Sequence, residues 1–463
     1  MATLLNTRET TMTRRSLLSP DPAVRAADLL LLCVVLAEDV FGLIDADAIN
    51  VAGILNIDLV WQVLLLVVSV VLYHKSRRVP GTKTSATQGV LLGTLIAMCF
   101  VAAWRCNVLT GQPFVRGILP QRGFMVCILA AILLRRPFKA GLIDMRRLGC
   151  GIVALGSVAA LLYLAQVSVG SSIIFIHANS SEKYGGLRLY VNGALSTMAG
   201  LVGMWIFLRS GRWKYLLPSF LALGVVLFVS KSRLELVIYL TVLIFLFVSS
   251  RGPANTKVLV VCIAALALIL FTQTEYFGQV SESFATGQIG GAEDTGTIRL
   301  DGRIYYDNVL QSTGSNLFGC GYPSTLYLPA AQMAGFEFNY LLVDNGVFGF
   351  RYVYGDLGVT NAALCVILAV AVAFRNRRNG RLSFAVSYVL YLVLPCFYFA
   401  WWWNTSDWAV MTALVFSSFW AVSMPMLLPE NLDISSGQRA VGCQGGAYRS
   451  AYAGLSRSKG AAL

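Results

Sequence analysis

Apolar blocks alternate with polar connectors along almost the whole chain, and this pattern predicts membrane-spanning helices. A helix needs about 20 apolar residues to cross the hydrocarbon core. No segment shows the strict alternation of an outer-membrane β-barrel, so a helical bundle is the expected way to satisfy the backbone in lipid. The blocks lie at about 27–45, 57–73, 88–104, 117–134, 148–167, 188–208, 215–230, 234–249, 257–273, 354–374, 382–401 and 408–426.

The fold class that follows is all-α, a polytopic integral membrane bundle of about 12 transmembrane helices within residues 27–426. Composition agrees, because 57% of the residues are hydrophobic and 13% are charged, whereas soluble domains carry about 25% charged residues. Residues 1–26 are polar and basic without a signal-peptide cleavage site, so we expect a cytoplasmic N-terminal segment and a retained first helix. Residues 427–463 are rich in Gly, Ser and Ala, which predicts a disordered cytoplasmic tail.

The basic residues predict the orientation of the bundle. If the N-terminus is cytoplasmic and the sides alternate, most of the 36 Lys and Arg residues fall in cytoplasmic connectors, as the positive-inside rule requires. Both termini are then cytoplasmic, and the net charge of +13 belongs to that face and does not indicate nucleic-acid binding. The exceptions on the outer side are Arg105, Arg116, Arg122, Lys183, Arg188, Lys231, Arg233, Arg299, Arg303 and Arg351.

These outer basic residues have two possible explanations. Each of them alone could be an interfacial anchor or the partner of an acidic residue such as Glu38, Asp39, Asp58 or Glu235. As a set they favour a functional role, because recognition of a polyanion needs several guanidinium groups around its phosphate oxygens. An anion at the outer face of a membrane, half in lipid, fits a lipid-linked diphosphate.

One external connector, residues 274–353, is much longer than the others. Up to residue 297 it is polar and rich in Gly, whereas residues 298–354 are rich in Tyr and Phe. Long loops without regular structure tend to be functional, and aromatic rings are suitable surfaces for sugar rings. Trp401, Trp402, Trp403 and Trp408 lie at the outer ends of the last two predicted helices, where an interfacial aromatic belt is the alternative reading.

Cysteine and histidine do not indicate a metal site. The chain has 10 Cys without metal-ligand spacing and only two His, so we expect neither a metal nor a cofactor. Cys106 and Cys320 fall in predicted external loops, and a disulfide between them is a minor alternative to two buried thiols.

Three segments resemble a known family. They are Ser230-Lys231-Ser232-Arg233; Asp301-Gly302-Arg303 through Tyr306 with the later Asn316-Leu317-Phe318-Gly319-Cys320-Gly321; and Val343-Asp344-Asn345-Gly346 with Gly355-Asp356-Leu357-Gly358. In order and spacing they resemble the bacterial Wzy-type polysaccharide polymerases and the related O-antigen ligases. The residue-level likeness covers about 130 positions from Ser230 to Gly358. The ligases usually have His where this chain has Asp344, which favours a polymerase.

The resemblance implies a GT-C-like glycosyltransferase of the bacterial inner membrane, with residues 274–353 as a large periplasmic loop. It would polymerise oligosaccharide repeat units, linked to undecaprenyl diphosphate, into exopolysaccharide or O-antigen without a metal. Its implied partners are lipid-linked oligosaccharides, membrane lipid, a chain-length co-polymerase and a flippase, and no nucleic acid.

The expected catalytic residues are Arg233, Arg303 and Asp344. Without a metal, guanidinium groups must stabilise the charge of the departing lipid diphosphate. The general base stays open among Asp344, Asp301, Glu337 and His177, and the Asp344-Asn345 pair could equally be a turn or a helix cap. The expected substrate-binding residues are Arg122, Arg188, Lys231, Arg299, Asp301, Tyr306, Gly319, Gly321, Asn345 and Arg351.

Two other classes compete with this reading. A secondary transporter, including a flippase for lipid-linked sugars, also commonly has twelve helices with both ends inside, although the helix interiors here are nearly free of ionisable residues. A membrane scaffold or receptor without catalysis leaves the outer arginines and the aromatic loop unexplained.

Overall fold

We analysed a computed structural model of the chain. It describes residues 21–45, 57–80, 84, 86–171, 173–183, 186–191, 193–250, isolated positions between 254 and 278, 295–375, 382–397, 403 and 406–421. These residues all belong to one compact unit, residues 1–428. The predicted cytoplasmic tail at 427–463, most of the predicted helix at 257–273 and the Gly-rich half of the long loop lie outside the described residues.

Helices account for most of the described chain, in agreement with the all-α prediction. Six segments among the described residues are long and apolar enough to cross a membrane: Ile57–Ser76, Ala86–Thr110, Phe114–Lys139, Met145–Val169, Trp213–Ser230 and Val343–Val372. Their length and composition support a membrane-embedded protein. The count of twelve spans and the GT-C-like arrangement remain predictions.

The helix bounds agree well with most of the apolar blocks. The long helices are α1 (Pro22–Ala37), α2 (Ile57–Ser76), α3 (Ala86–Thr110), α5 (Arg122–Lys139), α6 (Met145–Val169), α7 (Ala194–Ser210), α8 (Leu217–Gly224), α9 (Arg233–Ser249), α14 (Gly346–Arg375), α15 (Leu382–Val393) and α17 (Ser406–Ala421). The short helix α4 (Phe114–Ile118) precedes α5, and α12 (Thr295–Ser312) and α13 (Leu328–Met333) lie in the long loop.

Local capping shows why α1 and α6 begin where they do. Asp21 Oδ1 accepts the N–H of Ala23 at 3.0 Å, with Pro22 as the first helical residue. Asp144 Oδ1 accepts the N–H of Arg147 in the same way at 3.0 Å. Such side-chain caps satisfy amides that have no partner inside the helix. Arg147 then pairs with Asp28 at 2.6 Å, so the two helices begin at the same end of the bundle.

One expected helix start was wrong. The block at 188–208 does not begin as a helix, because β2 (Gly186–Leu189) pairs antiparallel with β1 (Ser180–Lys183) as a hairpin, in which Arg188 is opposite Ser181. Leu187 and Leu189 alternate with Arg188, which is the two-residue period of a strand. Arg188 therefore lies on β2, and α7 begins only at Ala194.

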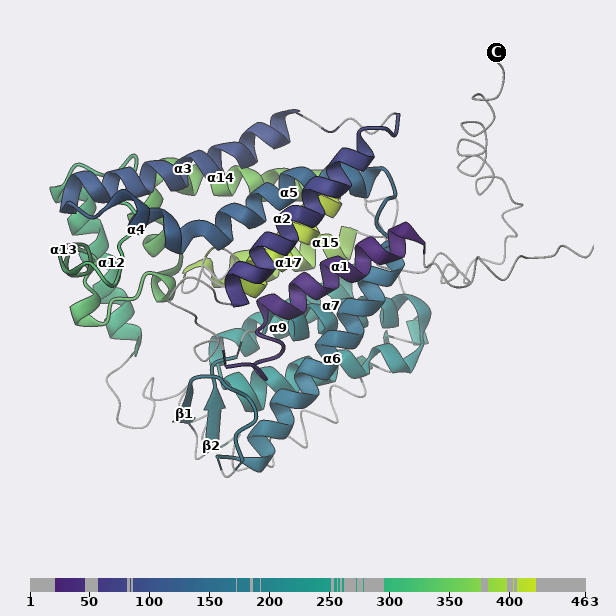
Figure 1. Ribbon diagram of the computed structural model, residues 1–463. Helices are drawn as coiled ribbons and strands as arrows, with labels where there is room; N and C mark the ends of the chain where they lie inside the picture. Colours follow the sequence, from purple (N-terminus) through teal and green to yellow (C-terminus); the bar gives the residue numbers. More distant parts are fainter. Residues whose placement is uncertain are drawn as a thin grey trace, which may run out of the picture. The chain divides into compact units, whose positions relative to one another are not determined.

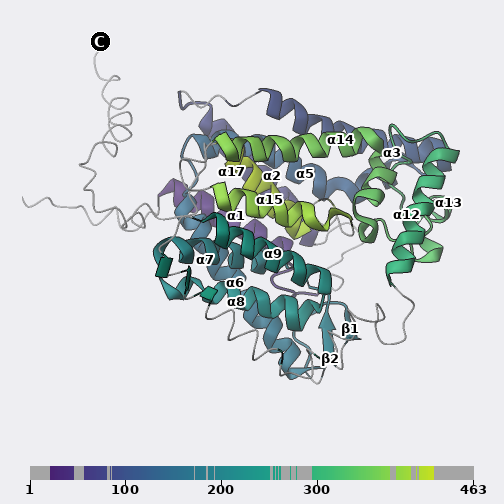
Figure 2. The same ribbon diagram turned by 180° about the vertical axis from the view of Figure 1, so that it is seen from behind.

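The connectors gather at two ends of the bundle, as the alternation of sides predicts. At the end assigned to the outer side, the N–H of His177 donates to Gly42 O at 2.7 Å, and Arg116 Nη1 donates to Leu326 O at 3.0 Å. At the other end, Arg136 Nη2 donates to Arg77 O at 3.2 Å. Figures 1 and 2 show α12, α13 and the β-hairpin at the same end of the bundle. Which end faces the cytoplasm remains a prediction.

Candidate functional site

An unusual turn joins α8 to α9 at the outer end. The last part of the helical segment, η4 (Val225–Ser230), is π-helical, a rare form that is frequently found at functional sites. Lys231 follows with φ of 48°, a left-handed conformation that is uncommon for residues other than Gly, Asn and Asp. Ser232 then caps α9, since its Oγ accepts the N–H of Glu235 at 3.3 Å. The predicted Ser-Lys-Ser-Arg turn is therefore real, and Arg233 is the first residue of α9.

Lys231 joins this turn to the β-hairpin. Its side chain is largely buried, and a Cβ placed on Gly186 would lie 2.8 Å from Nζ, so only glycine fits there without a shift of the lysine. Burial lowers the pKa of Lys231 from its ordinary value of 10.5, because the charged form loses hydration. An anion bound next to Lys231 would stabilise its charged form and raise its pKa again. Lys231 is thus a buried cation beside the hairpin that carries Arg188.

Arg188 connects three elements of the site. Its guanidinium lies over the ring of Tyr190, with Cζ 4.3 Å from the ring centroid, and Nη1 donates to the Tyr190 hydroxyl at 3.2 Å. It also attracts the carboxylates of Glu235 and Asp344. Arg188 Nε is buried and has no hydrogen-bond partner among the described residues. One donor of this guanidinium therefore remains for a ligand.

Asp344 and Asn345 lie in η6 (Val343–Asn345), just before α14. Arg299 of α12 attracts Asp344 as Arg188 does, so two arginines from different elements act on one carboxylate. Asn345 is 1% exposed, and its Nδ2 donates to Leu341 O at 3.0 Å. Asn345 Oδ1 is buried without a hydrogen-bond partner in the part of the chain that the structure describes. A buried polar atom in that state is uncommon and suggests a binding function.

The Asp301-Gly302-Arg303 motif packs against Asn345. A Cβ on Gly302 would lie 3.0 Å from Asn345 Nδ2 and 3.1 Å from Oδ1, so α12 approaches η6 closely at this glycine. Arg303, the next residue, places Cζ 5.1 Å from the centroid of the Phe348 ring on α14. Asp301 is exposed. The Asp301-Gly302-Arg303 and Val343-Asp344-Asn345-Gly346 segments therefore meet, and the hairpin that carries Arg188 contacts Lys231 of the Ser230–Arg233 turn through Gly186.

Three glycines build a second contact between the long loop and α14. Gly319 has φ of 74°, and a Cβ there would lie 2.4 Å from Val353 O, at the point where α14 is interrupted by Gly355. The N–H of Cys320 donates to Tyr352 O at 2.7 Å. Gly321 has φ of 92°, and a Cβ there would lie 2.1 Å from Ala102 O of α3. Gly319 and Gly321 therefore allow the turn to dock onto α3 and α14, a scaffolding role for two residues predicted to bind substrate.

Several outer arginines hold this scaffold. Arg105 donates from Nη2 to Ser315 Oγ at 2.7 Å and from Nε to Gly319 O at 3.3 Å. Arg351, which we expected to bind substrate, forms ion pairs with Asp307 of α12 and, at 2.6 Å, with Asp356 of α14. Its Nη2 also donates to Asn316 Oδ1 at 3.3 Å. Arg351 thus joins α12, the glycine turn and α14. Arg122, another residue that we expected to bind substrate, is the first residue of α5.

Many aromatic residues of the loop form a packed cluster. Tyr306, an expected substrate contact, is 1% exposed, packs against the tilted ring of Tyr352 at 4.9 Å between centroids and donates its hydroxyl to Tyr340 O at 2.6 Å. Its burial raises the pKa of the phenol above the ordinary value. Trp403 is also buried, against Phe350 and other rings, rather than exposed in an aromatic belt. These rings stabilise the loop, and Tyr306 is not accessible to a sugar in this conformation.

The structure also bears on the acids and thiols. Glu235 accepts the Tyr391 hydroxyl at 3.4 Å and faces Arg188, which makes it a candidate base that we considered only as an arginine partner. The signal in the sequence that could have identified Glu235 as a site residue is its position two residues after Arg233. The alternatives Asp301, Glu337 and His177 are exposed. Cys106 and Cys320 are buried free thiols, so the disulfide alternative is not observed.

Glu38 has a local structural role instead. Its Oε1 accepts the N–H of Leu195 at 2.7 Å, in the first turn of α7, and its Oε2 accepts the Tyr163 hydroxyl at 3.3 Å.

Among the described residues, no group of three or more His, Cys, Asp or Glu side chains could hold a metal ion. The arrangement at Arg188 and Asp344 combines guanidinium groups with the buried amide of Asn345, and guanidinium groups are suited to bind an anion.

Comparison with known proteins adds no family. No protein-family model matches the chain, and no curated protein matches it. The resemblance to polysaccharide polymerases thus stays a prediction based on the three motifs.

Proposed function

We propose that this protein is a membrane glycosyltransferase that polymerises lipid-diphosphate-linked oligosaccharide repeat units at the outer face of a bacterial inner membrane. The observation that carries the proposal is the convergence of the three motifs at one end of the bundle. The charges of Arg188 on β2 and Arg299 on α12 both attract the Asp344 carboxylate. Arg303 follows Gly302, which packs against Asn345. Guanidinium groups in such a set favour a polyanion such as a diphosphate.

The reaction transfers a growing glycan to the next repeat unit. An acceptor hydroxyl attacks the anomeric carbon of the donor sugar, the bond to the lipid diphosphate breaks, and the diphosphate leaves with the bonding electron pair. The hydroxyl proton moves to a carboxylate, for which Asp344 and Glu235 are the candidates within the arginine cluster. Positive side chains placed beforehand around the leaving group stabilise its developing charge without reorganisation.

The proposal is tested with purified protein in liposomes and a lipid-linked repeat unit, with product length followed by gel electrophoresis. We expect chain growth by the wild type and severe loss in Arg233→Ala and Arg303→Ala. The Lys variants should also be impaired, because lysine cannot make a two-pronged contact with phosphate. Arg212→Ala is the matched control, since Arg212 is exposed in the connector between α7 and α8 at the other end. Wild-type rates in folded Arg233→Ala and Arg303→Ala variants would refute the assignment.

A second candidate, a flippase for lipid-linked sugars, has one observation in its favour. α14 is interrupted at Gly355, where φ is 69° and ψ is −173°, and broken helices are typical of transporters. The same liposomes separate the two functions. Movement of a fluorescent lipid-linked sugar across the bilayer without chain growth would favour the flippase, and chain growth without movement would favour the polymerase.

A further inference from the structure

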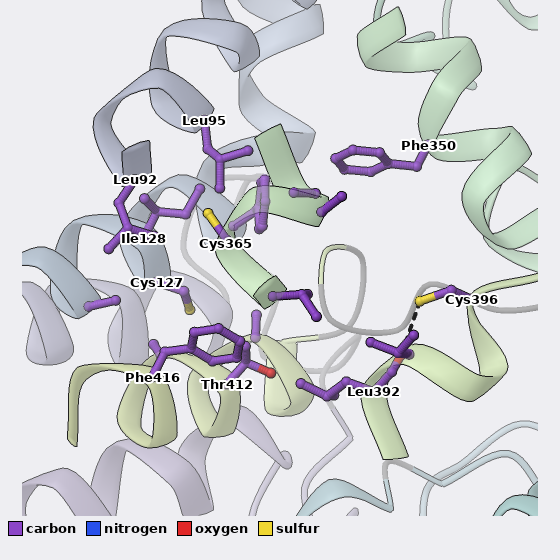
Figure 3. A pocket seen from close by; sticks show the side chains of 18 of the residues that line it. Leu92, Leu95, Cys127, Ile128, Phe350, Cys365, Leu392, Cys396, Thr412 and Phe416 are labelled. Carbon is purple, nitrogen blue, oxygen red and sulfur yellow. Dashed lines mark hydrogen bonds between the residues drawn. The ribbon is translucent and has the colours of Figure 1, made fainter. Parts of the chain in front are cut away.

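An apolar cavity of about 320 Å³ lies between α3, α5, α14, α15 and α17. Its lining is aliphatic, aromatic or sulfur-containing, with the Thr412 hydroxyl as a rare polar group. Figure 3 shows side chains such as Leu95, Cys127, Phe350 and Phe416 around a common open centre. Protein interiors are close-packed, and voids much larger than a water molecule are few. A cavity of this size therefore suggests a ligand, and its lining suggests an apolar one.

The cavity begins beside the arginine cluster. Val347 and Phe350 of α14 line it. Between them in sequence is Phe348, the ring next to which Arg303 lies, and Asn345 precedes Val347 by two residues. Residues on successive positions of a helix point in different directions. One short segment of α14 thus presents Phe348 to the cationic cluster and Val347 and Phe350 to the cavity.

The lining of the cavity extends along α14. It runs from Val347 to Ile367, on both sides of the interruption at Gly355. An engineered cavity of about 150 Å³ holds a single benzene ring. Only about twice that volume is available here, distributed along several helix turns. An apolar lining that extends over several turns suits a flexible apolar chain.

We propose that this cavity binds the lipid chain of the substrate whose diphosphate occupies the arginine cluster. The inference rests on the proposed function, and it names the part of the substrate that is bound within the protein rather than in the bilayer. Bilayer lipid is as apolar as the cavity wall, so packing and position govern the interaction rather than transfer from water. Holding the chain close to Val347 would place the diphosphate beside Arg303 and Asn345 and orient the anomeric carbon.

Photo-crosslinking tests where the chain lies. The probe is farnesyl diphosphate with a diazirine at the end of its chain, and labelled residues are mapped by mass spectrometry in the full-length protein in liposomes. We expect label on the cavity residues Cys127, Val359 or Cys365. Label confined to exposed positions such as Leu364 would overturn the inference. A phospholipid with the same diazirine on an acyl chain is the second arm, and equal labelling of the cavity by it would also overturn the inference, in favour of a bound structural lipid.

A pair of substitutions on one helix tests the cavity itself. Ala362→Phe places a ring in the cavity, whereas Ala371→Phe adds the same ring at an exposed position of α14. We expect Ala362→Phe to reduce farnesyl diphosphate labelling at least about tenfold, the usual scale for a steric change in an apolar pocket, with inorganic diphosphate binding unchanged. Ala371→Phe should change neither. Equal labelling of both variants would overturn the inference. Cavity labelling in a wild type that shows no chain growth would support the chain site while refuting the polymerase proposal.

Discussion

Replacement of Gly321 by alanine is a direct test of how the long loop is attached to the bundle. Gly321 has φ of 92°, and a Cβ there would lie 2.1 Å from Ala102 O and 2.5 Å from the backbone N of Cys106. These atoms belong to the backbone of α3, a regular helix, so they cannot move independently. The loop must therefore shift away from α3 or the helix must deform.

The expected cost has two parts. A positive φ costs a residue with a Cβ about 1–2 kcal/mol, and forcing a methyl group into a packed site costs about 1–3 kcal/mol. Gly314 provides the matched control, because it has φ of 61° in the same loop but nothing within 4 Å of a Cβ. Gly314→Ala thus has only the conformational cost. The difference between the two variants should be about 1–3 kcal/mol, the overpacking part alone.

The buried thiols Cys106 and Cys320 serve as reporters. Local opening exposes them, so their rate of reaction with a maleimide follows the population of the open state. A difference of about 1–3 kcal/mol corresponds to roughly 5- to 150-fold faster labelling in Gly321→Ala than in Gly314→Ala. Labelling of the two peptides is quantified by mass spectrometry under native conditions. Equal rates in the two variants would show that the loop is not docked on α3 at Gly321.

Two further predictions concern charge. The lowered pKa of Lys231 means that its positive charge is lost at a lower pH than the ordinary 10.5, so the affinity for inorganic diphosphate should fall as pH rises through that lowered value. Lys231→Arg should extend binding to higher pH, and identical pH profiles by calorimetry would contradict this role. Glu38→Gln should destabilise the fold by about 1–3 kcal/mol, because the buried charge-assisted bond to the N–H of Leu195 is weakened. Thermal unfolding should show a much smaller effect for Asp28→Asn, because its pair with Arg147 is exposed to solvent, which screens the two charges.

The hydrophobic pattern predicted the helix bounds well where the connectors are polar. It did not predict them where prolines or a short strand determine the backbone conformation. The block at 148–167 corresponds closely to α6. The block at 117–134 lies within the apolar helical segment Phe114–Lys139, but that segment is not a single helix, because Pro113 and Pro120 produce the short helix α4 and a 3-10 turn before α5 begins at Arg122. Proline lacks an N–H and fixes φ, so it favours the first turn of a new helix. Apolar character alone does not reveal that restart.

The hairpin that carries Arg188 was missed for a related reason. Its strands have four residues each, so the alternation of Leu187, Arg188 and Leu189 is too short to be separated from the apolar block that follows. The consequence is functional. An arginine assigned to a helix start instead lies on the hairpin that contacts Lys231, where its charge attracts the carboxylates of Glu235 and Asp344.

The role of each outer arginine depends on partners that are distant in the sequence. Arg105 donates to Gly319 O, 214 residues away, and Arg116 donates to Leu326 O, 210 residues away. A sequence pattern can place these residues on one side of the membrane but cannot pair them across such separations. The positive-inside rule assigns all these cations to one side. Only the packing of the loop divides that set into arginines that hold the scaffold and arginines that surround Asp344.

That division also explains why acidic residues lie within a site proposed for an anion. Cations placed together at a low-dielectric boundary repel one another, and the Asp344 and Glu235 carboxylates offset that repulsion at Arg188 and Arg299. A diphosphate that enters the cluster must compete with these carboxylates for the same guanidinium groups. The net binding energy is thus the difference between two sets of charge-assisted bonds. For the proposed polymerase a modest affinity for the leaving group is useful, because the spent lipid diphosphate must depart before the next repeat unit can bind.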